Sequence, residues 1–594
     1  MQSTRCQRKD SYNFRKERET EMKKMLSLLL IAVMLVSMTA CSGSGGGNSS
    51  SASSSGSKNA DSSAANSSSK NTDTAEGSYV NPPGVYPIVN DKITLKILTA
   101  NDGTIVEDLE TNGFTLWYEE LTNIHIDWDV MVGSGNDNNQ KRAMILASGD
   151  LPDCVMSASC SATELLSYAE QGIIIPLDPY FDDYAPNVKK VIETVPIAKQ
   201  SSITPDGHVY ALNRLVDSYN ESIAKRAWIY QPWLDKLGLD LPTTTEEFRA
   251  VLEAFRDQDP NGNGLNDEVP FAGSDTSANG EVDSFILNSF LYYDRGNYGL
   301  ELLDDGTVRC NIGSEEYREG LRYLNGLLKD GLLDPATFTQ DRNALKALTE
   351  GGEVNLLGSV TAFYWGHFTN ENGEKHRDLE FVAIPVLKGP EGVQYAYDRG
   401  TLMNGQRFYI TSACKYPEAA MRWQDYFFDP DGMMDMGFSV NAGQEGVDWK
   451  RADAGVLGID GKQAKYEYIT APGQKQNNYW FQFPAYYESA DYINSWAANL
   501  PSSRKEVFGN QEQAAKYKPY SAFDKRVSII FPYPEYATEW TDLSLNMKTT
   551  VEKYRTGFIL GDYSLDTDWD QYLSDLQASG IDRYAELAGL MVTK

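Results

Sequence analysis

One pattern near the start of the folded part restricts this chain more than any other: a strand, a helix and a second strand in close succession. Residues 93–98 alternate apolar and polar side chains, which is typical of a half-buried strand. Residues 114–121 place large apolar side chains at helical spacing, and residues 124–131 alternate again. Two strands joined through one helix by short connections predict a βαβ unit, and hence an α/β fold with a largely parallel sheet.

The amino-terminal residues predict export and a lipid anchor. Lys23 and Lys24 precede an apolar run, residues 25–40, which ends in small residues before Cys41. The run is too short to span a membrane comfortably. It resembles a bacterial lipoprotein signal, residues 1–40, and this resemblance implies that cleavage leaves Cys41 as a lipidated first residue at the extracellular face of the membrane. The long charged stretch before it suggests Met22 as the true start.

Composition excludes several classes of function. Residues 41–80 are rich in Ser and Gly and predict a flexible tether, whereas the rest can bury one large or two medium cores. A net charge of −31 argues against nucleic acid and anionic lipid as partners. The four histidines form no pair at helical ligand spacing, which argues against a histidine-built metal centre. Spacing leaves open whether Cys154 and Cys160 form a disulfide.

A polar loop after a predicted helix has the ligand register of a calcium-binding loop. Oxygen-bearing side chains recur at every second position, with Gly264 at the sharp turn. Pro270 replaces the bidentate glutamate expected at the last ligand position and disfavours an exit helix. We therefore interpret the loop as a structural Ca²⁺ site, in preference to a polar turn that binds nothing. The predicted ligands are Asp259, Asn261, Asn263, Leu265 (through its carbonyl), Asp267 and Glu268.

Three segments occur in an order that resembles a known family. They are residues 146–153 (LASGDLPD), 170–177 (EQGIIIPL) and 206–212 (DGHVYAL). Together they resemble the extracellular solute-binding proteins of ABC importers, and more narrowly the large carbohydrate-binding lipoproteins of Gram-positive bacteria. The resemblance covers roughly residues 92–594. Within the same family, the polar loop is similar to the calcium loop of the alginate-oligosaccharide binding proteins.

The resemblance implies an α/β, periplasmic-binding-protein-like fold, in which two α/β lobes are joined by hinge strands around a ligand cleft. It implies a non-enzymatic function: capture of a carbohydrate and delivery to the ABC transporter permease subunits. The expected division is a first part of the N-lobe, a second lobe with the calcium loop, a second part of the N-lobe, and a C-terminal helical segment mostly in the second lobe. These parts are residues 81–218, 219–400, 401–450 and 451–594.

Sugar sites need flat aromatic rings edged by polar groups. Trp365 follows a predicted strand and precedes Gly366, so we expect its ring to stack on a sugar at the strand's carboxyl end. Plain core packing is the alternative for each aromatic. The predicted ligand-binding residues are Trp365, Tyr364, Trp480, Asp398, Arg399 and Ser157.

Two classes of function remain open at this point. The chain has neither a P-loop nor a G-x-S-x-G motif, which argues against ATP hydrolysis and against a serine hydrolase. Its many acidic residues leave open a surface-anchored glycoside hydrolase, which would use two carboxylates about 5–9 Å apart. The ordered family motifs favour the binding protein, and release of reducing ends from glycans would distinguish the two.

Overall fold

A computed structural model describes residues 79–592 except 134, 278, 372 and 501–503. The signal segment, Cys41 and the tether up to residue 78 lie outside the described residues, so those interpretations stay predictions. Among the helices of the described part, none combines the length and the apolar character that crossing a bilayer requires. The cysteines of this part, including Cys154 and Cys160, are free thiols.

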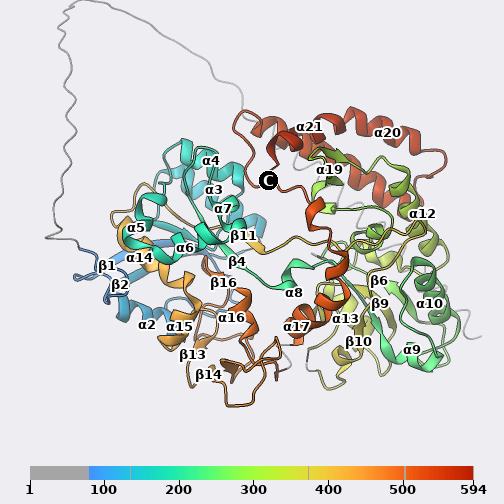
Figure 1. The fold of residues 1–594 in the computed structure, drawn as a ribbon, viewed down its shortest axis with the longest axis horizontal. Coiled ribbons are helices and arrows are strands. Elements are labelled where there is room, and N and C mark those ends of the chain that lie inside the picture. Colours follow the sequence, from blue (N-terminus) through green and yellow to red (C-terminus); the bar gives the residue numbers. More distant parts are fainter. Residues whose placement is uncertain (1–78, 134, 278, 372, 501–503, 593–594) are drawn as a thin grey trace, which may run out of the picture. The chain divides into compact units, whose positions relative to one another are not determined.

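The N-lobe, residues 79–216 and 402–497, is built on a six-stranded sheet of order β16–β4–β11–β3–β1–β2 (Figure 1). β1 and β2 pair in parallel from Ile93 and Ile124 onward, which confirms the βαβ prediction. β11 runs antiparallel to both of its neighbours, so the sheet is mixed. The strands are β1 (Ile93–Ala100), β2 (Ile124–Met131), β3 (Cys154–Met156), β4 (Leu212–Val216), β11 (Leu402–Ile410) and β16 (Tyr487–Glu488).

Local patterns explain these elements. The two-residue alternation of β2 turns Ile124, Ile126 and Trp128 into the core. The helices of the N-lobe pack around this sheet, and amphipathic ones such as α6 (Pro186–Thr194) bury their apolar stripe (Figure 1). These helices are α2 (Gly113–Thr122), α3 (Gly135–Ser148), α4 (Ala162–Glu170), α5 (Phe181–Tyr184), α6, α7 (Pro196–Ser202), α14 (Pro417–Asp425), α15 (Pro430–Asp435) and α16 (Ala490–Asn494).

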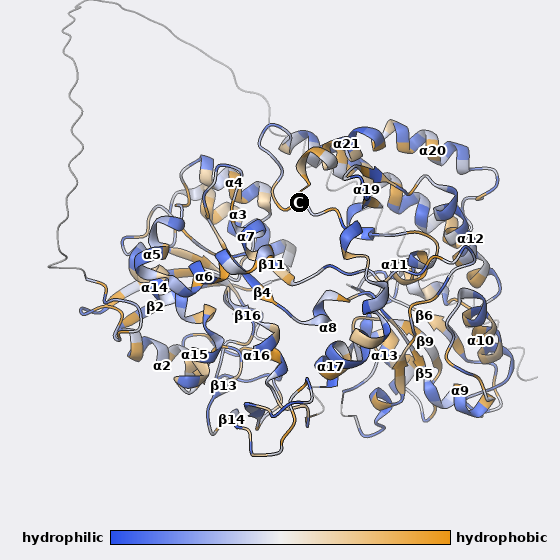
Figure 2. Ribbon diagram, viewed as in Figure 1, coloured by the Kyte–Doolittle hydropathy of each residue, from blue (hydrophilic) through white to orange (hydrophobic). Residues whose placement is uncertain are grey.

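The second lobe, residues 219–396 and most of 504–592, contains a four-stranded sheet of order β10–β5–β9–β6. In Figure 2, β5, β6 and β9 are coloured mainly as hydrophobic, which is typical of strands buried on both faces. α10 begins with the predicted capping box between Thr244 and Glu247. The strands are β5 (Ala227–Tyr230), β6 (Val269–Ala272), β9 (Leu357–Thr361) and β10 (Phe381–Ala383).

Helices enclose this second sheet as well, and short strand pairs complete both lobes. The helices are α8 (Tyr219–Ser222), α9 (Gln231–Leu237), α10 (Thr245–Asp257), α11 (Val282–Ile286), α12 (Glu315–Lys329), α13 (Arg342–Glu350), α17 (Arg504–Val507), α18 (Ala514–Lys516), α19 (Ala537–Leu560), α20 (Trp569–Ala578) and α21 (Ile581–Met591). The short strands are β7 (Leu300–Leu302), β8 (Val308–Cys310), β12 (Phe438–Ser439), β13 (Gly443–Gln444), β14 (Trp449–Arg451) and β15 (Tyr466–Tyr468).

Residues 451–594, expected as one helical segment mostly in the second lobe, are divided between the lobes. β16 joins the N-lobe sheet beside β4, and Trp496 packs in the same core. From α17 onward the chain belongs mainly to the second lobe, where α19 lies beside α12 (Figure 1). The Asn325 side-chain amide donates to the carbonyls of Phe558 and Ile559, at 3.1 and 3.0 Å.

The described chain passes from one lobe to the other three times. The passages lie between β4 and α8, between β10 and β11, and between α16 and α17. Hinges between lobes lie in connecting segments of this kind.

Candidate functional site

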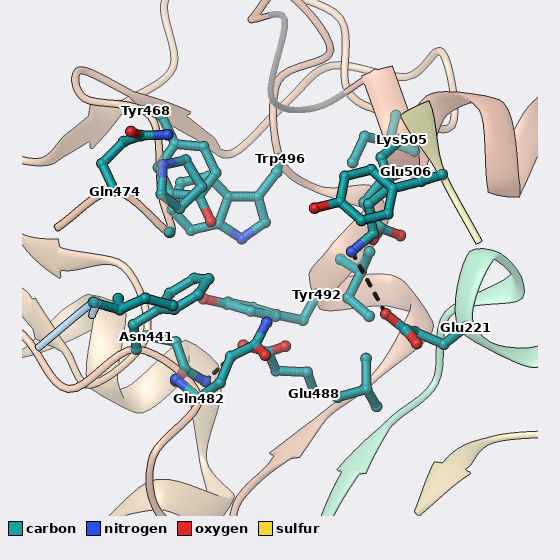
Figure 3. Close-up of a pocket in the computed structure, with 18 of the residues that line it drawn as sticks. Glu221, Asn441, Tyr468, Gln474, Gln482, Glu488, Tyr492, Trp496, Lys505 and Glu506 are labelled. Carbon is teal, nitrogen blue, oxygen red and sulfur yellow. Dashed lines mark hydrogen bonds and ion pairs between the residues drawn. The ribbon is translucent and has the colours of Figure 1, made fainter. Parts of the chain in front are cut away.

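A cavity of about 390 Å³ lies where residues of both lobes meet. In Figure 3, Tyr468, Trp496 and Gln474 occupy one side and Asn441, Gln482 and Glu488 another, all from the N-lobe. The second lobe contributes residues from α8, from the segment after β9 and from α17. They are Glu221, Tyr364, Glu371, Lys505 and Glu506.

A stacked aromatic pair forms one wall. The ring centroids of Tyr468 and Trp496 are 3.9 Å apart, with 14° between their planes. Tyr468 is the last residue of β15 and is partly exposed, whereas Trp496 follows α16 and is buried. Tyr468 is therefore the ring of this pair that offers surface to a ligand. A pair that is already stacked loses little conformational freedom when a ligand binds.

Two consecutive pocket residues hold strained backbone conformations. Phe481 and Gln482 have φ angles of +40° and +58°, in a region that costs residues other than glycine about 1–3 kcal/mol. The Phe481 amide donates to the Val440 carbonyl at 3.0 Å, and the Gln482 amide donates to Asn441 Oδ1 at 2.7 Å. These bonds fix the direction in which both side chains enter the cavity. Such strain gathers at functional sites.

Carboxylates supply the acceptors of the cavity. Glu488 accepts a hydrogen bond from Asn441 Nδ2 at 2.9 Å, and burial raises the pKa of Glu488 to about 6. Glu506 accepts from Ser218 Oγ at 2.6 Å and from Asn220 Nδ2 at 3.2 Å. Each carboxylate is thus oriented by neutral donors, and its remaining lone pairs stay available to a ligand.

An ion-pair cluster joins the segments that pass between the lobes. Glu221 on α8 lies 3.6 Å from Lys505 Nζ and 3.0 Å from Arg399 Nη2. Arg399 precedes β11, and Lys505 belongs to α17. The cluster therefore ties the three passages together at the edge of the cavity.

The structure places Trp365 in the core rather than at the cavity. Its side chain is 3% exposed, its Nε1 donates to the Phe381 carbonyl at 3.2 Å, and its ring lies 4.5 Å from that of Trp228. The turn after β9 directs Tyr364 to the cavity, and the next residue begins a short helical turn that packs back against the sheet. Of this predicted pair, only Tyr364 lines the cavity.

Trp480 is a second core residue. It is 1% exposed, and its Nε1 donates to Thr115 Oγ1 at 2.8 Å within the N-lobe. Phe114 meets its ring edge-on at 4.9 Å. The neighbouring Phe481 lines the cavity instead. At this position the sequence predicted Trp480, whereas its neighbour Phe481 is the ring that reaches the ligand space.

The three remaining predicted residues support the cavity from outside its lining. Asp398 accepts from Ser521 Oγ at 2.7 Å, and Arg399 Nε donates to the Glu221 carbonyl at 2.7 Å. Ser157 Oγ donates to the Phe483 carbonyl, close to the strained pair. These bonds position the segments that carry pocket residues.

The calcium-like loop connects α10 to β6, so a strand follows it, in agreement with the expectation from Pro270. Asp259 accepts from the amides of Gly262 and Gly264 at 2.9 and 3.1 Å, which wraps the loop around that carboxylate. Among the described residues, no group of three or more His, Cys, Asp or Glu forms a metal site. The predicted ligand set, however, also draws on Asn side chains and a carbonyl.

Glu268 is the residue of this loop whose carboxylate lacks a partner in the described part of the protein. Both of its carboxylate oxygens are buried, and neither has a hydrogen-bond partner. An unpaired buried carboxylate is costly, and a cation bound beside it would remove that cost. The donors of the loop, oxygen atoms of carboxylates, amides and the backbone, are those that Ca²⁺ prefers.

Several pocket residues were not foreseen from the sequence. All but two of them lie between residues 441 and 506, far from the strand that pointed to Trp365, and no motif marks them. The one local signal is the density of aromatic and amide side chains in residues 474–496. The unforeseen residues are Arg214, Glu221, Asn441, Tyr468, Phe481, Gln482, Glu488, Trp496, Lys505 and Glu506.

The chain is similar to known proteins over most of its length. FusA of Streptococcus pneumoniae serotype 4, a fructooligosaccharide ABC transporter substrate-binding protein, is 28% identical over 516 residues, which are 84% of this chain and 90% of FusA. The solved structure of FusA with kestose is 26% identical, with a TM-score of 0.69, and covers 84% of this chain and 98% of that one. An EF-hand mutant of FusA in complex with fructo-nystose is similar, with a TM-score of 0.68.

More distant structures share the fold. A solute-binding protein from Bifidobacterium longum subsp. infantis has a TM-score of 0.69 at 20% identity, covering 84% of this chain and 98% of that one. The alginate-binding protein AlgQ2 has a TM-score of 0.62 at 21% identity, covering 85% and 98%. The sequence profile of the bacterial extracellular solute-binding proteins matches residues 100–434. Because this profile spans more than half of the chain, the chain belongs to the bacterial extracellular solute-binding protein family.

Proposed function

We propose that this chain captures an oligosaccharide in the cavity between its lobes, as the substrate-binding subunit of an ABC importer. The observation that carries this proposal is a cavity lined by aromatic rings together with carboxylate and amide groups. Sugars present apolar ring faces edged by hydroxyl groups, so this lining matches them. FusA, whose name describes a fructooligosaccharide transporter substrate-binding protein, is similar in sequence to 84% of this chain.

The proposal includes a lipid anchor and a permease partner. Cys41 is the acylation site that the signal-like segment predicts, and residues 42–78 would let the folded part reach a transporter in the same membrane. The chain would then reside on the extracellular face of a Gram-positive type of membrane. Replacing Cys41 with Ser should release the protein from the membrane fraction, and unchanged fractionation would contradict the anchor.

We further propose a structural Ca²⁺ in the loop after α10. The unpaired oxygens of Glu268 and the loop wrapped around Asp259 support this site. Asn261, Asn263, Asp267 and the Leu265 carbonyl would complete the ligand set. The ion would neutralise the clustered carboxylates and fix the connection between α10 and β6. The EF-hand named in the FusA mutant is consistent with a calcium loop in a relative.

Isothermal titration of the purified chain with neutral and acidic oligosaccharides tests the main proposal. We expect at least one oligosaccharide to bind, and Tyr468→Ala to weaken that binding while Leu457→Ala, on an exposed apolar residue, leaves it unchanged. Chromatography of the same mixtures tests the competing hydrolase hypothesis. New reducing ends that disappear in Glu488→Gln would contradict a pure binding function.

A further inference from the structure

Acidic side chains outnumber basic side chains in the lining of the cavity. Four carboxylates line it, from Glu221, Glu371, Glu488 and Glu506, against two basic groups, from Arg214 and Lys505. Among the described residues, the lining therefore has two negative charges in excess, and Arg399, just outside the lining, balances one of them through its ion pair with Glu221. The negative side chains come from both lobes, so an occupant would meet carboxylates on opposite sides of the cavity.

The two basic groups are already engaged. Lys505 Nζ lies 3.6 Å from Glu221 and 4.0 Å from Glu506, so its charge is balanced within the protein. Arg214 is buried, donates from Nε to the Tyr486 hydroxyl at 2.6 Å and lies over that ring. Recognition of a sugar carboxylate ordinarily uses a bidentate arginine or a lysine that can turn toward it. Lys505 is therefore paired, and Arg214, whose Nε is held by Tyr486, is a single arginine in a lining with four carboxylates.

The acceptors favour hydroxyl donors. A carboxylate offers about four lone-pair positions, and the protein donors to Glu488 and Glu506 use only part of them. A sugar hydroxyl can donate to those positions. A uronate can only accept at its carboxylate and would stand against like charges in a partly desolvated space, which is strongly unfavourable.

We propose that this cavity selects neutral oligosaccharides and excludes those that carry uronate or other anionic groups, with Glu488 and Glu506 as the residues that determine this specificity. The inference rests on the proposed function, because it assumes that the cavity is the sugar site. It goes beyond that function because family membership leaves the charge of the ligand open: AlgQ2 is named for an anionic polymer and FusA for neutral fructooligosaccharides.

The test compares trisaccharides of equal length by calorimetry on the intact folded chain. The neutral set is 1-kestose, maltotriose, cellotriose, xylotriose and mannotriose, and the anionic set is trigalacturonate and trimannuronate. We expect the best neutral sugar to bind at least about 100-fold more tightly than either anionic one at pH 7.5. An anionic sugar that binds as tightly as the best neutral one would overturn the inference and leave the proposed function standing. If no sugar of either set binds, both fail.

Charge-neutral variants test the named residues. Glu506→Gln and Glu488→Gln keep the side-chain shape. We expect each to reduce the ratio of the affinity for neutral sugars to the affinity for anionic sugars about tenfold. Glu445→Gln, on an exposed glutamate paired with Arg451 outside the cavity lining, serves as the matched control and should leave this ratio unchanged. Melting curves establish that each variant is folded. If the ratio is unchanged in both pocket variants and in their combination, the specificity does not reside in these carboxylates.

Discussion

At the scale of single residues, neighbouring aromatics divide between the core and the ligand space. Tyr364 lines the cavity and Trp365 packs on Trp228; Phe481 lines it and Trp480 is buried. A one-residue step on a turn sends the next side chain in a different direction, so an aromatic cluster identifies the region but not the ring that reaches a ligand. Replacing the buried member of each pair should therefore lower stability, whereas replacing the member that lines the cavity should lower sugar affinity.

The pair Tyr364 and Trp365 makes this testable. Trp365→Ala should lower the free energy of unfolding by about 3–5 kcal/mol, because it empties a core position, and change sugar affinity little. Tyr364→Ala should lower affinity about tenfold with a small change in stability. Denaturant unfolding and calorimetry measure the two effects. Tyr364→Phe keeps the ring and serves as the control; reversed effects at the two positions would contradict the assigned places.

Glu488 predicts a dependence of stability on pH. Burial raises its pKa from 4.5 to about 6, with Asn441, Arg214 and Glu506 facing it. The folded state thus favours the protonated form, and the stability that this contributes is present below about pH 4.5 and lost as pH rises through about 6. Glu488→Gln should therefore melt at a higher temperature than the parent at pH 8, by an amount that vanishes below about pH 4.5, while binding sugar less well. An equal difference at both pH values would contradict this origin.

At the scale of elements, the loop between α10 and β6 should respond to calcium. Chelation should lower the melting temperature and leave sugar affinity mostly intact, because the loop does not line the cavity. Asp259→Ala combined with Asp267→Ala should melt like the chelated protein and no longer respond to added Ca²⁺. Asp304→Ala combined with Asp305→Ala removes the same charge from another turn and should keep the response. A calcium-loaded parent that chelation does not destabilise would refute the site.

α19 is joined to the second lobe by a buried charge cluster. Asp283 Oδ1 lies 2.7 Å from Arg295 and its Oδ2 lies 3.3 Å from Arg555 on α19, with each of these side chains mostly or fully buried. Asp275 also pairs with Arg295, at 2.5 Å, so the cluster holds two carboxylates and two arginines. Arg555→Met should cost roughly 3–5 kcal/mol of unfolding free energy, because it leaves both carboxylates with Arg295 alone and one buried charge uncompensated. Arg583→Met, in an exposed pair with Glu539, should change stability little. Equal effects of the two substitutions in denaturant unfolding would contradict this role of α19.

At the scale of the whole molecule, the cavity belongs to both lobes, so a ligand should stabilise both. At 100 times its dissociation constant, a ligand adds about 2.7 kcal/mol. We expect sugar to slow amide hydrogen exchange in β16 and α16 of the N-lobe and in α8 and α17 of the second lobe. Protection confined to one lobe would mean that the ligand contacts only that lobe.

Much of this protein follows from its sequence alone, because the relevant signals are local. The alternation at residues 93–98 and 124–131 predicted the strands that pair in parallel. Thr244 and Glu247 predicted the start of a helix. Pro270 predicted that no helix follows the calcium-like loop, and a strand follows it. Family motifs at residues 146–212 likewise predicted the membership that the family profile confirmed. Each of these depends on residues a few positions apart.

Tertiary structure decided the rest. The cavity brings Arg214, Glu221, Tyr364 and Lys505 together from distant segments, and β16 joins a sheet that begins almost 400 residues earlier. The direction of the Trp365 ring, and the assignment of residues 451–497 to the N-lobe, depend on which surfaces bury one another. Such burial is a property of the packed chain, since the free energy of each contact depends on partners that no short stretch of sequence contains.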